Sequence, residues 1–434
     1  MRLLQLRQKA CFSLCIAGAF LAIQLVGTAQ QTVPFDGAIP VAPAGFEPLP
    51  IPAEPLEFDT AEVMRIRVVP IARQLVNPWS LAFLPPSTSL GTGAGDVTML
   101  VTEKEGRLRI IRNGVLDPKP IPGVPTVRVQ GRSGLMEVLL HPQFATNRFV
   151  YFTYLKPVNE KQAALTVARG RFDGSAISEL KDIFSCGPGV SGPSRLAWGR
   201  DGKLYMTTPS SGNGSSSQDP NTYAGKVLRL NDDGTVPADN PFTGRVGHKP
   251  EVYTFGHRNS LGLAVNPTTG ELWQNEMGPN GGDEINILKP GANYGWPLVS
   301  LGRSYPGPWQ SPTFSKDGFE SPVVYWMPSI SLSGMTFYTG SKLPKWKGDV
   351  FVGGQRTGEI PGTGHLERVL VNDKLEELRR EALLVPLRMR IRDVRQGPDE
   401  LLYVLVDHEN GGVLRIEPSA TPQAPTSYSA RPPR

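Results

Sequence analysis

An all-β fold, and within that class a six-bladed β-propeller, is predicted by three features of this 434-residue sequence. First, 47 Gly and 42 Pro punctuate the chain, which is typical of short strands joined by tight turns. Second, one phrase recurs six times: a short alternating strand, a turn built from Pro, Asp, Asn or Gly, and a second strand that ends in Thr, Asn, Gly or Asp. Third, the 3.6-residue hydrophobic period of a long helix is almost absent. Four-stranded blades around an axis account for all three features, with an irregular pair of β-sandwiches as the alternative.

The chain begins with a predicted secretory signal peptide at residues 1–29. Three basic residues and no acid precede an apolar run at 10–23, and Gly27-Thr28-Ala29 supplies the small residues of a cleavage site. The apolar run is short for a bilayer span and is followed by Gln24. We therefore expect a periplasmic or secreted protein with no stable membrane insertion after cleavage.

Loss of this segment changes the charge balance. The whole chain has 45 Lys+Arg and 40 Asp+Glu, and removal of three basic residues with the signal peptide leaves 42 against 40. A nucleic-acid-binding protein needs a concentrated basic surface, so the near-neutral mature chain argues against nucleic acid as a partner. Cys186 is the one cysteine beyond residue 29, so no intramolecular disulfide is expected.

The rest of the chain divides into three parts. Residues 30–63 are predicted to form a Pro-rich N-terminal spacer or an extended arm on the domain surface, because they contain seven prolines and show no hydrophobic period. The folded propeller is expected over residues 64–417, with one short stretch at 373–384 that could be helical. The tail at 418–434, dominated by Pro, Ser and Thr, is expected to be disordered.

The six copies of the repeated phrase begin at residues 79, 134, 195, 262, 334 and 391, so they lie 55 to 72 residues apart. This spacing exceeds the roughly 40 to 50 residues of a usual propeller repeat and implies loops inserted between strands. Propellers carry functional groups on the loops at one mouth of the central channel. Candidate functional residues should therefore lie at equivalent edges of several copies.

Two such edges flank the fourth copy. The segment Gly256-His257-Arg258-Asn259 leads into its first strand and places a cation beside an amide. Residues 276–284 leave its second strand, and their Gly-Pro turn followed by two acids combines carbonyl and carboxylate oxygens, which are the ligands that calcium prefers. A surface turn that happens to be acidic is the alternative interpretation of this second segment.

A third edge carries Arg388, Arg390 and Arg392, which alternate with apolar residues. In a strand, this spacing puts the three guanidinium groups on one face. Stacked like charges repel unless an anion compensates them, so the pattern indicates a ligand that bears carboxylate or phosphate groups. A solvated edge strand is the alternative, and Arg356, after a strand of the fifth copy, is a further candidate cation.

The longest motifs resemble the soluble pyrroloquinoline-quinone (PQQ) glucose dehydrogenases, and within that group the aldose sugar dehydrogenases of the glucose/sorbosone dehydrogenase family. The similar segments are 256–259, 276–286, 293–297 and 390–405, and the similarity extends from about residue 70 to residue 416. The resemblance implies a six-bladed periplasmic oxidoreductase that binds PQQ and calcium. Such an enzyme moves a hydride from a sugar CH–OH group to the quinone and passes electrons to an external acceptor.

The resemblance also implies roles for individual residues. Arg258 and Asn259 match residues that contact the quinone, and Arg390 and Arg392 match those that hold the PQQ carboxylates. Arg132 and Arg356 stand where the family has a Gln and a quinone-contacting Lys. The implied metal ligands are the carbonyls of Gly278 and Pro279 for the PQQ-associated calcium, with Asp283 nearby, and Glu284 and Tyr294 for part of a second calcium site whose other acids are missing here.

The general base of the family is a His, and this sequence departs from it. Val190 and Ser191 occupy the places of the family's Asp and catalytic His. A serine hydroxyl has no useful basicity near neutral pH, so Ser191 is not expected to accept the sugar hydroxyl proton. His257 is the one histidine whose position could let it substitute, with a structural histidine as the alternative. The sequence thus predicts a sugar-oxidising quinoprotein, and the alternative is a diverged propeller that binds an anionic ligand or partner.

Overall fold

The structure is a computed structural model that describes residues 35–36, 39–40, 44–62, 64–86, 97–305 and 307–422. The predicted signal peptide and most of the predicted tail lie outside these ranges. Within them, no helix is long and apolar enough to cross a membrane. β1 (Phe35–Asp36) and β2 (Ile39–Pro40) form an antiparallel pair in a small unit that also contains residues 305–308.

The larger unit contains six antiparallel sheets, as the sequence predicts, and is a six-bladed β-propeller. Sheet 1 consists of β5 (Pro78–Phe83), β6 (Thr98–Glu103), β7 (Arg107–Arg112) and β8 (Val115–Leu116). Sheet 2 consists of β9 (Leu135–Leu140), β10 (Phe149–Pro157), β11 (Ala163–Phe172) and β12 (Ile177–Pro188). Sheet 3 consists of β13 (Leu196–Trp198), β14 (Leu204–Thr207), β15 (Lys226–Leu230) and β16 (Val252–Phe255).

The second half repeats this arrangement. Sheet 4 consists of β17 (Asn259–Val265), β18 (Leu272–Met277), β19 (Asp283–Ile287) and β20 (Val324–Trp326). Sheet 5 consists of β21 (Leu332–Phe337), β22 (Val350–Gly354), β23 (His365–Val371) and β24 (Glu377–Leu383). Sheet 6 consists of β25 (Ile391–Gln396), β26 (Leu402–Val406), β27 (Gly411–Pro418), β4 (Ile66–Leu75) and β3 (Leu56–Phe58). The short helices of the described chain are α2 (Phe144–Asn147), η1 (Ser215–Gln218), η2 (Pro344–Trp346) and η3 (Val385–Leu387).

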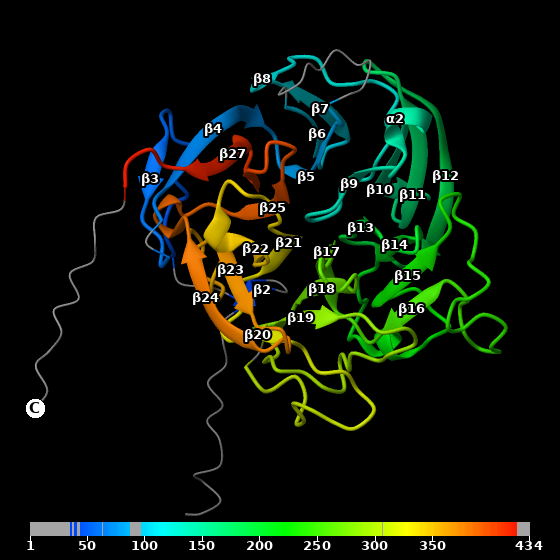
Figure 1. The fold of residues 1–434 in the computed structure, drawn as a ribbon. Helices are drawn as coiled ribbons and strands as arrows, with labels where there is room; N and C mark the ends of the chain where they lie inside the picture. The colour runs from blue at the N-terminus through cyan, green and yellow to red at the C-terminus, as the bar shows by residue number, and fades with distance from the viewer. Residues whose placement is uncertain are drawn as a thin grey trace, which may run out of the picture. The chain divides into compact units, whose positions relative to one another are not determined.

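The six sheets form a closed ring. Their first strands contact one another in the cyclic order β5, β9, β13, β17, β21, β25 and back to β5 (Figure 1). Between each pair of neighbouring sheets lies an apolar cluster, for example Trp273 and Ile285 of sheet 4 against Leu332 and Val350 of sheet 5. Burial of these strand faces between sheets is what holds the blades together.

Sheet 6 is built from both ends of the propeller. β4 pairs antiparallel with β27, from Ile66 opposite Pro418 to Leu75 opposite Gly411. β4 suits this position because Ile66 and Val68 are fully buried whereas Arg67 between them is exposed. The six-copy pattern begins at residue 79 and did not predict this closing strand, and β3, from the predicted spacer, adds a further edge strand.

The helix considered at residues 373–384 is wrong. Residues 377–383 of this stretch form β24, which pairs with β23 from Leu383 opposite Leu366 to Glu377 opposite Val371. β24 is an edge strand with many exposed charges, which in sequence resemble the polar face of a helix. Cross-strand contacts such as the ion pair between Arg368 and Glu381, 2.9 Å long, stabilise it as a strand.

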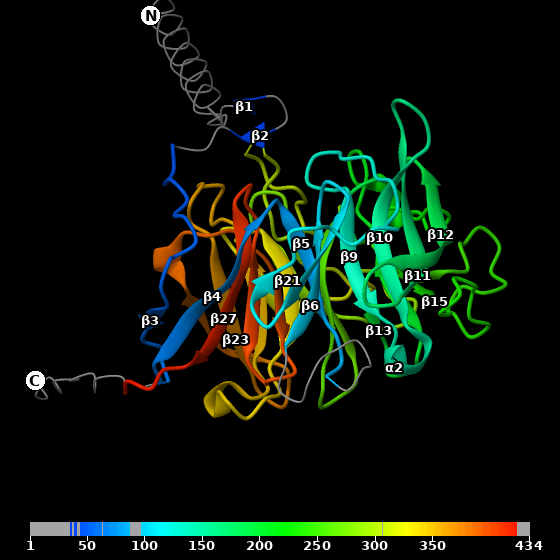
Figure 2. The ribbon, with the colours of Figure 1, turned by 90° about the horizontal axis from the view of Figure 1, so that it is seen from above.

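The topology brings two kinds of loop to the same mouth of the propeller. In an antiparallel sheet, the start of the first strand and the turn between the second and third strands lie at the same end. Figure 2 shows strands of neighbouring sheets running in roughly the same direction, so these loops gather at one face. Most residues predicted to act lie just before or at the start of the first strands β9, β13, β17 and β25, or follow the second strands β18 and β22. Asp283 and Glu284 begin the third strand β19, and Tyr294 lies in the loop after it.

Candidate functional site

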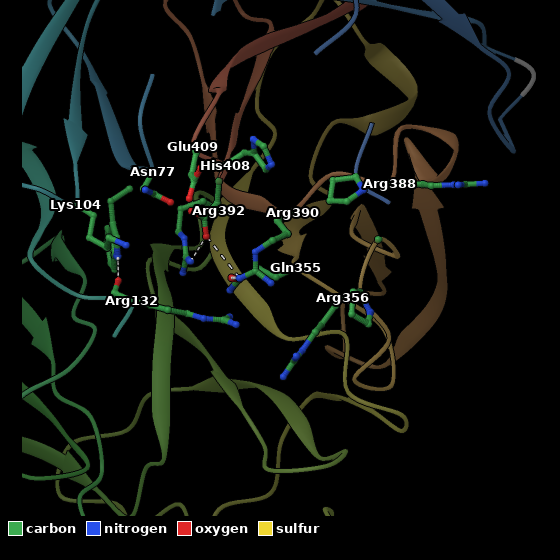
Figure 3. A pocket seen from close by; sticks show the side chains of 15 residues that line it. Asn77, Lys104, Arg132, Gln355, Arg356, Arg388, Arg390, Arg392, His408 and Glu409 are labelled. Carbon is green, nitrogen blue, oxygen red and sulfur yellow. Dashed lines mark hydrogen bonds and ion pairs between the residues drawn. The ribbon is translucent and has the colours of Figure 1, made fainter. Parts of the chain in front are cut away.

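A cavity of about 500 Å³ lies among these loops. Its lining comes from sheets 1, 2, 5 and 6 and from Pro48, which precedes the propeller strands. Figure 3 shows that the side chains of Arg132, Arg356, Arg390 and Arg392 extend toward a common space. We call these four residues the arginine cluster. Three separate sheets supply it, so residues far apart in the sequence form one cationic site.

Few carboxylates balance the arginine cluster. Asp407, at the end of β26, pairs with Arg392 and, at 3.5 Å, with Arg390. Arg356 pairs with Glu359, and Arg390 also donates a hydrogen bond to the side-chain carbonyl of Gln355. The described cavity lining carries six cationic side chains, Lys104, Arg132, Arg356, Arg388, Arg390 and Arg392, and two acidic ones, Asp407 and Glu409.

This imbalance shifts the protonation equilibria in the cavity. Burial, followed by the charges of Arg132 and other neighbouring arginines, lowers the pKa of Arg390. Burial inside the cavity and the charges of Arg392 and Arg356 also lower the pKa of Arg132. Burial alone would raise the pKa of Asp407, but Arg392 and Arg390 hold it below its usual value. Asp407 is therefore ionised, and the guanidinium groups destabilise one another until an anion binds.

Three buried nitrogen atoms at the cavity have no hydrogen-bond partner among the described residues. They are Nε2 of Gln355, Nε of Arg356 and Nε of Arg392. Buried donors without partners are unusual in folded proteins and point to a missing ligand. Guanidinium and amide donors are the groups that bind carboxylates well, so the cavity chemistry fits a polycarboxylate such as PQQ.

Arg388 does not belong to the arginine cluster, so the prediction that it shares a face with Arg390 and Arg392 is wrong. β25 begins only at Ile391, and Arg388 ends the short helix η3 with φ 56°, in the left-handed region. Its side chain points away from the other labelled arginines (Figure 3). Its guanidinium carbon lies 4.8 Å from the centroid of the Phe46 ring instead.

Arg258, Asn259 and the Gly278 turn lie at the same mouth but do not line the cavity described above. Nη1 of Arg258 donates hydrogen bonds to the carbonyls of Met277 and Gly278, 2.9 and 2.6 Å long. The guanidinium carbon of Arg258 lies 5.2 Å from the Trp296 ring centroid. Arg258 therefore braces the turn whose carbonyls were expected to bind calcium.

The side chains expected to bind calcium are engaged with the protein itself. Asp283 accepts four hydrogen bonds of 2.7 to 3.2 Å, from the N–H groups of Gly278, Ile330 and Leu332 and from the Ser329 hydroxyl. The Tyr294 hydroxyl donates to the carbonyl of Ile287 and accepts from the N–H of Lys289. Burial and the opposing Glu276 raise the pKa of Glu284 well above its usual value. Within the described ranges, no three His, Cys, Asp or Glu side chains form a metal-binding group.

Comparison of the sequence with known proteins shows which family this chain belongs to. The sequence model of the family described as Glucose / Sorbosone dehydrogenase matches residues 75–415. The chain belongs to this family. Aldose sugar dehydrogenase YliI of Escherichia coli is 36% identical over 362 residues, which cover 81% of this chain and 93% of that protein. Uncharacterized protein slr1608 of Synechocystis sp. is 40% identical over 390 residues, 84% of this chain and 90% of that protein.

Solved structures of glucose/sorbosone dehydrogenase relatives have the same fold. The apo-form of the soluble aldose sugar dehydrogenase from Escherichia coli matches with a TM-score of 0.75 and 34% identity, covering 82% of this chain and 100% of that chain. The PQQ-bound form of an aldose sugar dehydrogenase from Streptomyces coelicolor matches with a TM-score of 0.64 and 26% identity, covering 85% and 99%. The predicted fold and family are therefore confirmed.

The structure places Val190 and Ser191 in the loop before β13. Val190 is buried in the apolar cluster between sheets 2 and 3, and its carbonyl accepts a hydrogen bond from the N–H of Leu165. Ser191 is half-buried and does not line the arginine cavity. Val190 therefore packs in the core. That Val190 and Ser191 stand in the places of the family's Asp and His stays a prediction.

His257, considered as a substitute for the family's catalytic His, is fully buried. Its Nδ1 lies 3.2 Å from a Glu276 oxygen and its Nε2 lies 2.9 Å from the Thr254 hydroxyl. Its ring stacks on Tyr294 with centroids 4.6 Å apart. Both ring nitrogens already have hydrogen-bond partners, so His257 is a structural histidine.

Several residues of the cavity were not singled out from the sequence. Asp407 ends the second strand of the sixth copy, and a polar residue in that position was part of the repeated phrase. Asn77 and Lys104 occupy equivalent edges of the first copy. Comparing the same two edges in all six copies would have found these three residues. Other lining residues that were not singled out are Pro48, Trp79, Pro361, Gly362, His408 and Glu409.

Proposed function

We propose that this protein is an exported PQQ-dependent aldose dehydrogenase that moves a hydride from a sugar CH–OH group to the quinone and passes electrons to an external acceptor. The arginine cluster, with its excess of cations and its unpartnered nitrogens, is the observation that carries the proposal. Family membership supports the sugar substrate, and the PQQ-bound structure of the Streptomyces coelicolor relative supports the cofactor.

The chain's own residues would bind and orient the cofactor. Arg132, Arg356, Arg390 and Arg392 would hold its carboxylates, and Gln355 would donate its side-chain N–H. Asp407 would keep Arg390 and Arg392 in position through its ion pairs. When bound, PQQ supplies an electrophilic quinone that takes the hydride and both electrons of the C–H bond. Arg258 and Asn259 match family residues that contact the quinone, and we propose the same role for them here.

Proton transfer is the step that the departures from the family affect most. Within the described lining of the cavity, the proton-accepting side chains are Asp407, His408 and Glu409. Asp407 is tied to two arginines, and Nδ1 of His408 already accepts a hydrogen bond from the N–H of Asn410, 3.0 Å long. Nε2 of His408 and the carboxylate of Glu409 belong to exposed residues. If neither of them takes the role of the family's His, turnover should be about a hundred- to ten-thousand-fold below that of a relative with the His.

Calcium remains a prediction, with the carbonyls of Gly278 and Pro279 as ligands. The Gly278 carbonyl already accepts a 2.6 Å hydrogen bond from the positively charged Arg258, which opposes the approach of a second cation. Because Asp283 and Tyr294 are already engaged, we derive no step through this ion. Calorimetric titration with calcium, before and after PQQ is added, would test whether the turn opens only when the cofactor is present.

Titration of the purified mature chain with PQQ tests the main proposal. We expect a shifted quinone absorbance with a one-to-one end point, and aldose-dependent reduction of a redox dye. Replacing Arg390 with Met should weaken binding by about tenfold or more, because a hydrogen bond to a charged group contributes about 1.5 to 3 kcal/mol. Absence of any bound quinone spectrum would exclude the proposal.

A second candidate function is a binding module for an anionic ligand, with redox chemistry lost. The buried Val190 and the Ser191 beside it favour this candidate. The variant Ser191→His separates the two. If the cofactor site is intact, we expect it to raise aldose turnover about a hundredfold or more. If PQQ binds but neither the native protein nor this variant oxidises aldoses, the binding-module function is correct.

A further inference from the structure

Residues 45–52 form an extended arm that crosses from sheet 5 to sheet 6, and we call them the arm. The arm precedes β4 and lies outside residues 75–415, which the family model matches. Pro48 nevertheless lines the arginine cavity. A segment outside the residues that the family model matches therefore contributes to the lining of this cavity.

The first end of the arm is held by sheet 5. The N–H of Phe46 donates a 2.9 Å hydrogen bond to the carbonyl of Pro361, in the loop after β22. Gly362 approaches so closely that a Cβ atom on it would lie 2.0 Å from the Phe46 carbonyl oxygen. The Arg388 guanidinium adds the cation–π contact with the Phe46 ring.

The second end is held by sheet 6. The guanidinium of Arg73, on β4, donates hydrogen bonds of 2.5 Å to the carbonyls of Pro52 and Ala53. Ile51 packs against the apolar cluster between sheets 5 and 6. A Cβ atom on Gly412 of β27 would lie 2.6 Å from Cδ1 of Ile51, so the arm and the sheet are in close contact here.

Between these two anchors, the arm borders two neighbouring cavities, the arginine cavity through Pro48 and a second one. A second cavity of about 330 Å³ is lined by Leu49, Pro50 and Ile51 on one side and by Met389 and Val406 on the other. Both cavities share Pro48, Arg390, Asp407 and His408. The prolines at 48, 50 and 52 limit the conformations of the free arm, so little entropy is lost when it lies in place.

We propose that the arm is a fixed wall of the arginine cavity that retains the bound anionic ligand and limits the size of what can enter. The identity of that ligand as PQQ rests on the proposed function above, but the wall itself follows from the anchors and the shared cavity lining. Loosening the arm would join the arginine cavity to the second cavity and open a new route for release.

The test compares three proteins: the mature native chain, the double variant Phe46→Ala/Pro48→Gly, and Pro55→Gly. Pro55 lies beyond the arm and lines neither cavity, so its variant adds similar backbone freedom without changing the wall. Thermal unfolding of all three checks that the propeller is intact. Two readouts follow, one without any ligand and one with bound carboxylates.

The first readout is the rate at which phenylglyoxal modifies arginines, mapped by mass spectrometry. We expect Arg390, which is partly buried beside Pro48, to react several-fold faster in the double variant. Exposed Arg200, on the turn between β13 and β14 at the other end of the sheet, should react equally in all three. The second readout is the dissociation rate of PQQ and of benzene-1,2,4-tricarboxylate. Both should leave the double variant about tenfold faster, because changes in affinity of one site appear mainly in the off-rate.

Equal arginine reactivity in the native chain and the double variant would contradict the proposal that the arm is a wall of the cavity, whichever ligand the cavity binds. Equal release rates of a bound carboxylate would also overturn its retaining role. If none of the proteins binds PQQ, the proposed function is wrong. The arginine reactivity and the release rate of the tricarboxylate still test whether the arm is a wall of the cavity. If only the double variant binds a carboxylate, the arm excludes ligands from the cavity, which supports the proposal. If none of the three proteins binds a carboxylate and arginine reactivity is equal in all of them, the proposal is rejected.

Discussion

At the scale of single residues, the arginine cluster brings cations close together. Their mutual repulsion destabilises the ligand-free protein and is relieved when an anion binds. Each guanidinium is close to another cation, and the pKa of Arg390 and that of Arg132 are lowered by burial and by their neighbours. Such sites are held in place by the surrounding fold and release this repulsion when an anion binds. Affinity for the ligand and stability of the free protein should therefore change in opposite directions.

The variant Arg132→Gln tests this relation. Removing one cation should weaken PQQ binding by about 10- to 100-fold, since a charge-assisted hydrogen bond is lost, and should slightly raise the thermal midpoint of the ligand-free protein. Absorbance titration and thermal unfolding measure the two effects. Arg200→Gln, at the opposite end of sheet 3, should change neither. A lower midpoint for Arg132→Gln would show that the arginines are not in mutual repulsion.

Asp283 offers a pH-dependent test of the turn at Gly278. Burial, partly opposed by hydrogen bonds from Ser329, Leu332 and Gly278, raises the pKa of Asp283 to about 6 from a usual 3.8. The folded state then binds this proton more tightly than the unfolded state, so the contribution of Asp283 to stability is greatest below about pH 4 and is lost as the pH rises to about 6.

Urea unfolding of the native chain and of Asp283→Asn at pH 4 and at pH 7 measures this contribution. We expect the stability advantage of the native chain over the variant to shrink between pH 4 and pH 7. An advantage that grows instead would mean that the four donors outweigh burial and hold the pKa below 3.8.

At the scale of elements, β4 decides whether the ring closes. It supplies the strand between β27 and β3, and its buried residues fill the cluster between sheets 5 and 6. Closure through strands from both ends of the chain gives sheet 6 contacts of very long sequence separation. Local periodicity cannot indicate such a partner, although the alternation within β4 itself is visible in the sequence.

Neighbouring residues of β4 provide a matched pair of substitutions. Ile66→Ala should lower the free energy of unfolding by about 2 to 5 kcal/mol, because it leaves a cavity in a fully buried position. Arg67→Ala, which removes an exposed ion pair with Glu417, should cost less than about 1 kcal/mol. Urea unfolding at constant slope measures both. Similar losses for the two variants would show that β4 does not pack as an integral strand.

At the scale of the whole propeller, charged residues from the first strands meet in a buried network. Arg195 of the loop before β13 pairs with Glu137 of sheet 2 at 3.1 Å and with Asp393 of sheet 6 at 3.3 Å. Arg395 pairs with the same two acids, and Ser80 of sheet 1 donates to Glu137. Two arginines and two acids thus link four sheets.

Breaking this network should have a large effect on stability. Arg195→Met leaves Glu137 and Asp393 with less compensation in a fully buried position, and we expect a loss of about 3 to 5 kcal/mol. The exposed Arg200→Met is the matched control and should stay within about 0.5 kcal/mol. Chemical denaturation followed by tryptophan fluorescence measures both. Equal midpoints would mean that apolar packing between sheets alone holds the ring.

The sequence by itself determined the number of blades, the family, and the cations Arg132, Arg356, Arg390 and Arg392 that meet in the cavity. The blades could be counted because each of them repeats a local pattern, and the family and Arg132 followed from motifs that resemble the family. Strand alternation alone was not sufficient, since it grouped Arg388 with Arg390 and Arg392. The departure from the family's His at Ser191 is a prediction from the same motifs.

Only the tertiary structure decided what lies beside those residues. In the folded chain, Arg388 contacts the Phe46 ring and Asp283 accepts hydrogen bonds from four donors. Asp407 pairs with the arginines, and Pro48 lines the cavity. Each of these contacts joins elements that are distant in sequence. Periodicity within one strand reports the direction of its side chains, but the partners of those side chains depend on how six sheets close into a ring.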